Sequence, residues 1–170
     1  NLCFYTFRST CRLPIGNSMS NDFNSPSELK LIQKRVGEWL QSELAKDLVI
    51  KSVDYDQEES RWYVRVSGEE KQNYMILITL GQRTLHFETY VMPAPEENEA
   101  KFYEHILRRN QKLHGIFFLI GDENALYLSG ELQNEWITEK NLDWIIGSMY
   151  AAVELTFKAA LRIGFASRFH

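Results

Sequence analysis

The stretch from His86 to Glu131 limits the fold of this chain more than any other part of the sequence. A strand-like run ends at Pro93 and Pro95, which stop a strand because proline has no N–H to donate to a neighbouring strand. A helix-like run follows and closes on residues 107–110, and two further strand-like runs then flank the turn residues 121–124. A strand, a helix and a hairpin in this order indicate an α+β domain.

Four strand-like segments, including the one that ends at Pro93, follow one another before the predicted central helix. Residues 49–55, 61–66, 74–80 and 84–91 show the period of strands and are separated by short turn-forming sequences such as Gly81-Gln82. Connections this short favour antiparallel neighbours, because parallel strands need a long crossover. We therefore expect an antiparallel meander.

A helix is predicted before the meander and another after it. Residues 25–28 combine an N-cap serine, a proline at the first helical position and a glutamate placed to reach back to the cap, and the helix that they begin should end near Lys46. For the central helix we expect Pro95 in the first turn. The acidic residues Glu96, Glu97 and Glu99 would then suit the positive end of its dipole.

The last helix is expected to begin after Thr138 and to run to about Ile163. It should stop at Gly164, where a positive φ costs least. The predicted order of elements is αββββαββα, which describes an α+β domain with an antiparallel sheet and helices packed on it. At 170 residues the chain is long enough for one such domain, which we place at residues 25–170.

Charge and hydropathy exclude two classes of partner. A formal charge of −4 with scattered basic residues offers no attraction to nucleic acid. The longest apolar run is far below the ~20 residues that cross a bilayer, so we expect neither membrane insertion nor membrane binding.

The N-terminal segment, residues 1–24, is expected to be disordered or non-native, as an expression remnant, a misplaced start or a transit peptide. It holds both cysteines, Cys3 and Cys11. If Met19 is the true start, the domain has no cysteine, which is compatible with a cytoplasmic protein.

Residues 85–167 resemble the YbjN family. The resemblance lies in the order and spacing of several short motifs. These are YVMP (90–93), PEEN (95–98), LRRN (107–110), LHGI (113–116), LYLSGEL (126–132), IT (137–138) with LD (142–143), and GFAS (164–167). The resemblance implies a fold like that of the type III secretion chaperones and a cytoplasmic, often dimeric protein that is sometimes labelled a sensory transduction regulator. It implies no activity and no catalytic residues.

No catalytic, cofactor or metal constellation emerges from the residues themselves. The four histidines, His86, His105, His114 and His170, lie far apart and lack the short spacing of metal ligands. Of the four glutamates near His105 and Tyr103, which include Glu88, the helix dipole explains the three at the helix start, so acid–base catalysis is disfavoured. The nucleophile elbow, the phosphate loop and the dinucleotide fingerprint are also missing. We therefore predict a protein that is not an enzyme.

An anion site is one alternative. Arg108 and Arg109, with His105 one turn earlier, could hold a phosphate or a partner's carboxylate, because arginine binds such groups through a planar fork. The ordinary explanation is that cations at a helix C-terminus stabilise it by about 0.3–1 kcal/mol, with Asn110 helping to close the helix. A small-anion or metabolite sensor is the corresponding alternative function.

The last helix has a second apolar line opposite its core-facing stripe. Its positions follow the spacing i, i+4, i+7 and i+11, with a mid-helix glycine beside them: Trp144, Ser148, Ala151, Leu155 and Gly147. This line is either a subunit or partner interface, or packed under another part of the chain, or simply exposed. We favour the interface, and we predict a non-enzymatic module that binds a protein or peptide and forms a homodimer.

Overall fold

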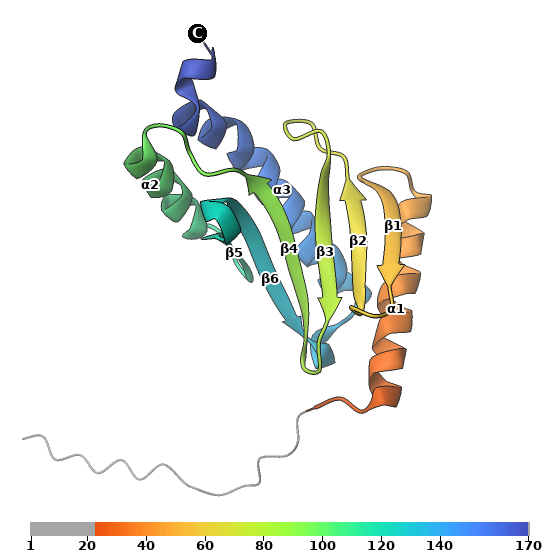
Figure 1. Ribbon diagram of the computed structural model, residues 1–170. Helices are drawn as coiled ribbons and strands as arrows, with labels where there is room; N and C mark the ends of the chain where they lie inside the picture. The colour runs from red at the N-terminus through yellow and green to blue at the C-terminus, as the bar shows by residue number, and fades with distance from the viewer. Residues whose placement is uncertain (1–22, 170) are drawn as a thin grey trace, which may run out of the picture.

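A six-stranded antiparallel sheet forms the centre of the protein, which a computed structural model describes for residues 23–169 (Figure 1). The strands lie in the order β1-β2-β3-β4-β6-β5. Their bounds are β1 Ile50–Asp56, β2 Arg61–Val66, β3 Tyr74–Leu80, β4 Thr84–Met92, β5 Ile116–Ile120 and β6 Leu126–Gln133. The first four strands form the predicted meander. The later strand of the second hairpin, β6, pairs with β4, and the earlier strand, β5, therefore lies at the edge of the sheet.

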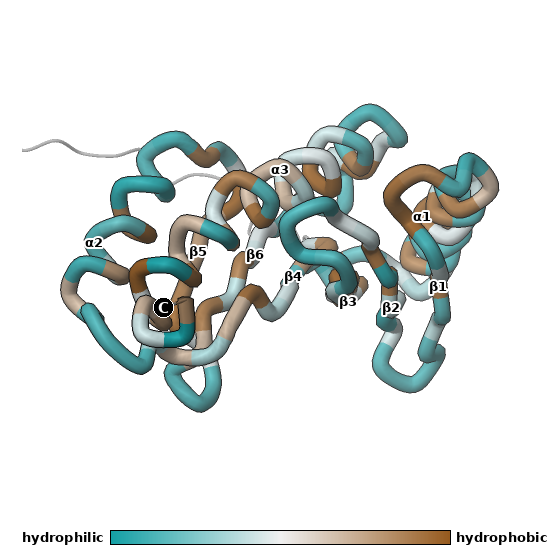
Figure 2. The backbone as a smooth tube through the Cα atoms, turned by 90° about the horizontal axis from the view of Figure 1, so that it is seen from above, coloured by the Kyte–Doolittle hydropathy of each residue, from teal (hydrophilic) through white to brown (hydrophobic). Residues whose placement is uncertain are grey.

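Three α-helices accompany the sheet in the described part of the chain: α1 (Pro26–Ala45), α2 (Glu99–Asn110) and α3 (Glu139–Gly164). Short 3-10 turns complete the chain: η1 (Asp122–Asn124), η2 (Asn134–Trp136) and η3 (Ala166–Phe169). Seen from above, α3 lies along the middle of the sheet, α1 lies at the β1 end and α2 at the β5 end (Figure 2). The predicted order αββββαββα and the α+β class are confirmed.

The predicted start signals of the first and last helices form as expected. Ser25 Oγ accepts a hydrogen bond from the Glu28 N–H at 3.3 Å, and the Glu28 carboxylate accepts one from the Ser25 N–H at 2.6 Å. At α3, Thr138 Oγ1 accepts from the Asn141 N–H at 3.2 Å. Each cap satisfies a backbone donor that has no partner within the helix.

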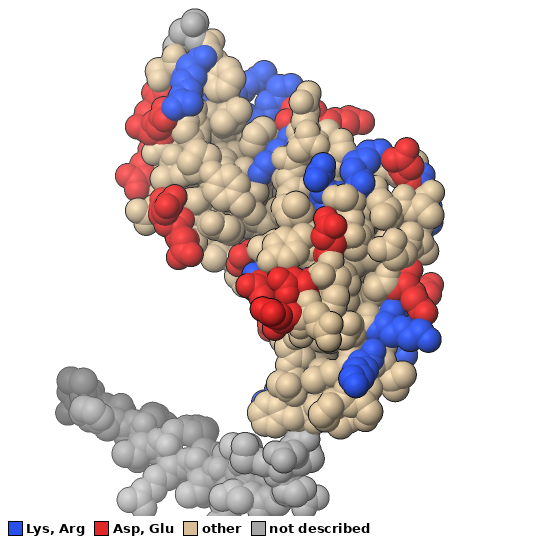
Figure 3. All heavy atoms as spheres, turned by 45° about the vertical axis from the view of Figure 1, so that its right-hand side comes forward, with Lys and Arg blue, Asp and Glu red and all other residues tan. Residues whose placement is uncertain are grey.

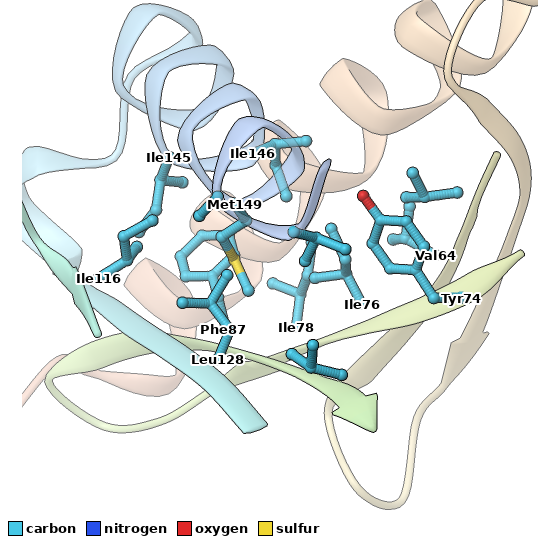
Figure 4. Close-up of a cluster of buried hydrophobic side chains, with 14 of the residues drawn as sticks. Val64, Tyr74, Ile76, Ile78, Phe87, Ile116, Leu128, Ile145, Ile146 and Met149 are labelled. Carbon is cyan, nitrogen blue, oxygen red and sulfur yellow. The ribbon is translucent and has the colours of Figure 1, made fainter. Parts of the chain in front are cut away.

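The core lies between α3 and the covered face of the sheet (Figure 4). Alternate strand residues point toward the helix, because successive side chains of a strand face opposite sides. The buried residues that meet there include Ile76, Ile78, Phe87 and Leu128 from the strands and Ile145 and Met149 from α3. Burial of one such side chain stabilises the fold by about 1.5–3 kcal/mol.

The start of α2 differs from the prediction. The helix begins at Glu99 after Asn98, so Pro95 is not in its first turn and only Glu99 remains there to suit the dipole. Glu96 instead pairs with the Arg168 guanidinium, and a Glu97 carboxylate oxygen accepts a hydrogen bond from the Ser167 N–H at 2.6 Å. These two glutamates bind the turn that follows α3. The hydrogen bond between Glu97 and Ser167 joins residues 70 positions apart, so local spacing cannot reveal it.

The end of α3 also differs from the prediction. Gly164 is the last helical residue and is not in the positive-φ region. Its importance lies in packing, because a Cβ there would come within 2.9 Å of Phe102 Cδ2 and of Pro95 Cβ. The backbone oxygen of Gly164 also accepts hydrogen bonds from the N–H groups of Glu96 and Glu97, so close contact with the α2 region explains this glycine.

The N-terminal boundary of the packed chain includes two residues that the prediction placed outside the domain. The Asn24 N–H donates to the Gln82 oxygen at 3.2 Å, and Asn134 Nδ2 donates to Asn24 Oδ1 at 2.8 Å. The Arg83 guanidinium lies 4.3 Å from the centre of the Phe23 ring. The remaining predictions for the N-terminal segment, including its two cysteines, concern residues outside the described range.

Candidate partner-binding surface

The outer face of α3 carries the apolar line that the sequence indicated. We call Trp144, Ser148, Ala151 and Leu155, with Gly147 beside them, the α3 row. Trp144 is 45% exposed and Leu155 68% exposed, whereas the next positions on the helix, Ile145 and Thr156, are buried. The side of α3 that faces the sheet is thus covered by the chain, and most of the α3 row is left open.

One end of the α3 row rests on the loop between α2 and β5. Gly115 has φ of +72°, a conformation that favours glycine, and the indole of Trp144 lies over it. A Cβ at Gly115 would come within 2.7 Å of Trp144 Cη2. The α2–β5 loop therefore covers part of the Trp144 ring, and Leu155 stays uncovered. The alternative that the line packs under another part of the chain is thus true only for part of Trp144.

Gly147 faces open space. Within the described chain, nothing approaches within 4 Å of the position that its Cβ would occupy, so no intrachain backbone explains this mid-helix glycine. The space belongs to a pocket of about 160 Å³ between the end of α1, the α1–β1 loop and α3. We call it the α1–α3 pocket. It is lined by Trp39, Glu43, Leu48, Val49, Ile50, Asp143, Ile146, Gly147 and Tyr150.

The α1–α3 pocket has an apolar interior and an acidic rim. Trp39, Ile50 and Ile146 are buried core residues, while Leu48 at the mouth is 71% exposed. Glu43 and Asp143 contribute carboxylates, and Lys46 Nζ lies 2.5 Å from a carboxylate oxygen of Glu43. The hydrogen bond to Glu43 raises the pKa of the Lys46 ammonium, with smaller contributions from the charges of Glu43, Asp143 and Glu139.

Sequence reasoning missed this pocket because its residues come from three elements. Trp39 lies within the predicted first helix, and Leu48 lies in a connection without periodicity. The one available signal was Gly147, because a glycine inside a helix costs about 1 kcal/mol relative to alanine and calls for a reason.

A second cluster that the sequence did not indicate surrounds Lys71, in the loop between β2 and β3. Lys71 Nζ donates to the backbone oxygens of Tyr90 at 2.5 Å and Val91 at 2.7 Å. The ammonium also lies 5.2–5.7 Å from the ring centres of Tyr74, Tyr90 and Phe157. Burial lowers the pKa of Lys71 to about 8.

The same loop is held to α3 by Glu154. Its carboxylate accepts hydrogen bonds from the N–H groups of Glu69 and Glu70 at 2.8 Å and of Lys71 at 3.4 Å. Because these contacts use backbone donors, they fix the path of the loop. The contacts of Lys71 and Glu154 are best explained as structural, because together they hold the β2–β3 loop against β4 and α3.

Of the predicted anion-binding residues, Arg108 is already paired and His105 is partly buried, whereas no ion pair of Arg109 is found among residues 23–169. The Arg108 guanidinium is bound to Glu104, with its Nε at 2.9 Å and Nη2 at 2.6 Å from the same carboxylate oxygen. His105 Nε2 is buried without a hydrogen-bond partner among residues 23–169. Burial and the charge of Arg109 lower the pKa of His105, which favours the neutral imidazole.

Asn110 does not have the helix-closing role expected of it. Its side chain instead forms hydrogen bonds with the backbone of β5.

Within the described residues, no group of three or more His, Cys, Asp or Glu side chains is arranged to hold a metal ion. Nor is any helix of residues 23–169 both long and apolar enough to span a bilayer.

Charges on the face seen in Figure 3 are mixed. Acidic side chains form a group near the middle of this face, basic side chains lie near its top and its lower right, and uncharged areas lie between them. No continuous basic surface appears on this face that would suit a phosphate backbone.

Comparison with known proteins gives remote relatives. No family model matches the sequence. The chain is 28% identical to uncharacterized protein Rv0487 of Mycobacterium tuberculosis over 104 residues, which make up 61% of this chain and 57% of that protein. It is 27% identical to uncharacterized protein ML2442 of Mycobacterium leprae over 107 residues, 63% of this chain and 58% of that protein. The chain thus matches less than two thirds of the length of these relatives.

Comparison of structures identifies the fold. A chain of the HopA1–SchA chaperone–effector complex matches with a TM-score of 0.55 and 7% identity, covering 79% of this chain and 98% of that one. An uncharacterized protein from Methanothermobacter thermautotrophicus matches with a TM-score of 0.53 and 14% identity, covering 78% of this chain and 99% of that one. The predicted α+β fold is therefore confirmed, and it is similar to the fold of a chain in a chaperone–effector complex.

Proposed function

We propose that this protein is a non-enzymatic module that binds protein or peptide partners, as a chaperone-like or regulatory adaptor of the YbjN type in the cytoplasm. We further propose that it forms a homodimer through the α3 row. The observation that carries the proposal is the exposure of Trp144 and Leu155 on a helix whose opposite side is already buried in the core. A contiguous exposed apolar patch on a soluble domain is typical of an interaction site.

Two further observations support a binding function. The fold is similar to that of a chain in a chaperone–effector complex, in which one protein holds another. The α3 row also combines large anchors with small positions, since Ser148 and Ala151 lie between Trp144 and Leu155. Aromatic and aliphatic anchors flanking a flat area suit a helix or a second copy of the chain.

The small-anion alternative has less support. The Arg108 fork is occupied by Glu104, and the neutral form of His105 adds no positive charge. Arg109 would have to supply the positive charge for a phosphorylated metabolite, and a single arginine makes a weaker site than the predicted pair.

The test of the dimer is the mass of the chain in solution. We expect the native chain to sediment as a dimer, and the double variant Trp144→Ala with Leu155→Ser to sediment as a monomer with retained helical content. The matched control is Leu31→Ser with Leu107→Ser, which removes two leucines of similar exposure from α1 and α2. This control should remain dimeric. A monomeric native chain, or a dimer that persists in the Trp144/Leu155 variant, would remove the dimer contact from the α3 row.

A further inference from the structure

We propose that the α1–α3 pocket receives a single aliphatic side chain of a partner protein segment, and that its acidic rim selects segments with lysine or arginine next to that side chain. The inference rests on the proposed binding function and names the chemistry of the partner. Gly147, beside the α3 row, also lines the pocket. A bound segment would therefore lie between α1 and α3.

The size of the pocket argues for a side chain rather than a metabolite. Pockets that bind drug-sized ligands measure about 300–1,000 Å³, whereas this one measures about 160 Å³. That volume suits one leucine, isoleucine or methionine. Its interior of Trp39, Ile50 and Ile146 offers apolar contact to such a group.

Gly147 lines the pocket without adding a side chain to it. Any side chain at this position would begin in the space where, among the described residues, nothing lies within 4 Å. A glycine in the middle of α3 weakens the helix by about 1 kcal/mol, and an entrance for a partner's side chain accounts for that cost. Leu48, which is exposed at the mouth, extends the apolar contact beyond the pocket itself.

The charges at the rim argue for a basic neighbour of the inserted side chain. Glu43 and Asp143 line the pocket, and because Lys46 Nζ is already paired with Glu43 at 2.5 Å, Asp143 is the lining carboxylate that has no ion pair among residues 23–169. Complementary charge at an interface increases the association rate and disfavours partners of the same sign. An acidic segment would be repelled, and a second copy of this chain, with its net charge of −4, is a poorer match than a basic segment.

The experiment is a selection of short random peptides displayed on phage against the immobilised whole chain, at low salt and again at about 0.5 M salt, where exposed charges are screened. Selected sequences should carry leucine, isoleucine or methionine with lysine or arginine close by. The basic preference should fade at high salt. One selected peptide, synthesised with a fluorophore, then serves as the probe for affinity.

Four variants locate the binding. Gly147→Leu fills the entrance and should weaken probe binding about tenfold or more, which corresponds to at least about 1.4 kcal/mol. Asp143→Asn should weaken it by a smaller factor and reduce its dependence on salt. Gly147→Ala adds one carbon at the entrance and should weaken probe binding by less than Gly147→Leu, whereas Glu131→Gln, which removes an exposed acid on β6 outside the pocket, should bind like the native chain.

The outcomes separate this inference from the function on which it rests. If peptides are selected whose binding survives Gly147→Leu but is lost in Trp144→Ala with Leu155→Ser, the pocket inference is overturned and the binding function stands. Selection of aliphatic peptides without basic residues overturns the charge preference. If no peptide is enriched over the blocked surface, both the pocket inference and peptide binding are overturned.

Discussion

The side chain of Asn110 is hydrogen-bonded to both backbone polar groups of Phe118. Its Nδ2 donates to the Phe118 oxygen at 3.0 Å, and its Oδ1 accepts from the Phe118 N–H at 2.8 Å. Phe118 is the central residue of β5, the edge strand of the sheet. The amide at the end of α2 thus takes the place that a neighbouring strand would occupy, in a segment whose Phe117 and Ile120 are exposed.

Replacement of Asn110 by alanine should destabilise the protein and expose its edge. The loss of both partners of Phe118 should lower the free energy of unfolding by about 1–3 kcal/mol. It should also promote association that grows with concentration, because an open apolar edge pairs with other chains. Urea unfolding and sedimentation at several concentrations measure the two effects. Asn110→Asp keeps an acceptor for the Phe118 N–H and loses the donor, so it should fall between alanine and the native chain. Equal stability of all three would show that the contact contributes nothing.

Two glycines of α3 should respond in opposite directions to alanine. At Gly147 a Cβ meets no other part of the described chain, so Gly147→Ala should raise the free energy of unfolding by about 1 kcal/mol. At Gly164 a Cβ would come within 2.9 Å of Phe102 and Pro95, so Gly164→Ala should lower the free energy of unfolding by about 1–3 kcal/mol. Chemical unfolding of the two variants side by side measures both changes. A loss of stability in both would mean that a side chain at position 147 meets steric resistance.

The stability of the protein should rise with pH above about 8 because of Lys71. Burial lowers its pKa from 10.5 in the unfolded chain to about 8 in the folded one. Between these values the unfolded chain binds more protons, so the free energy of unfolding increases with pH. Tyr74 acts in the opposite sense above pH 10, because burial raises the pKa of its hydroxyl and the unfolded chain then loses a proton that the folded chain retains.

The variant Lys71→Met isolates this effect. Urea unfolding at intervals from pH 7 to about pH 10 should show the native chain gaining stability relative to Lys71→Met, whose profile lacks the contribution of the amine. The replacement keeps a side chain of similar length and volume beside Tyr74, Tyr90 and Phe157. Parallel profiles for the two proteins would show that Lys71 has the same pKa folded and unfolded.

The sequence predicted elements whose signals are local. The capping residues at Ser25 and Thr138 and the two-residue period of the strands depend on neighbours within a few positions, so the order of elements followed from them. The α3 row was also visible, because helical spacing alone places Trp144 and Leu155 on one side of the helix. These features survive folding because the interactions that cause them are made within one element.

Tertiary structure decided the features that depend on distant parts of the chain. Glu96 binds Arg168 instead of a helix dipole, Asn110 bonds an edge strand instead of closing its helix, and the pocket at Gly147 is built from two helices and a loop. Spacing along the sequence cannot reveal such contacts, because they depend on how elements far apart in the chain pack together. The sequence alone determined the helices, the strands and the second apolar line of α3, whereas the exposure of that line followed only from the packing. The packing of α1 against α3 decided that this side of α3 borders a pocket large enough for one side chain.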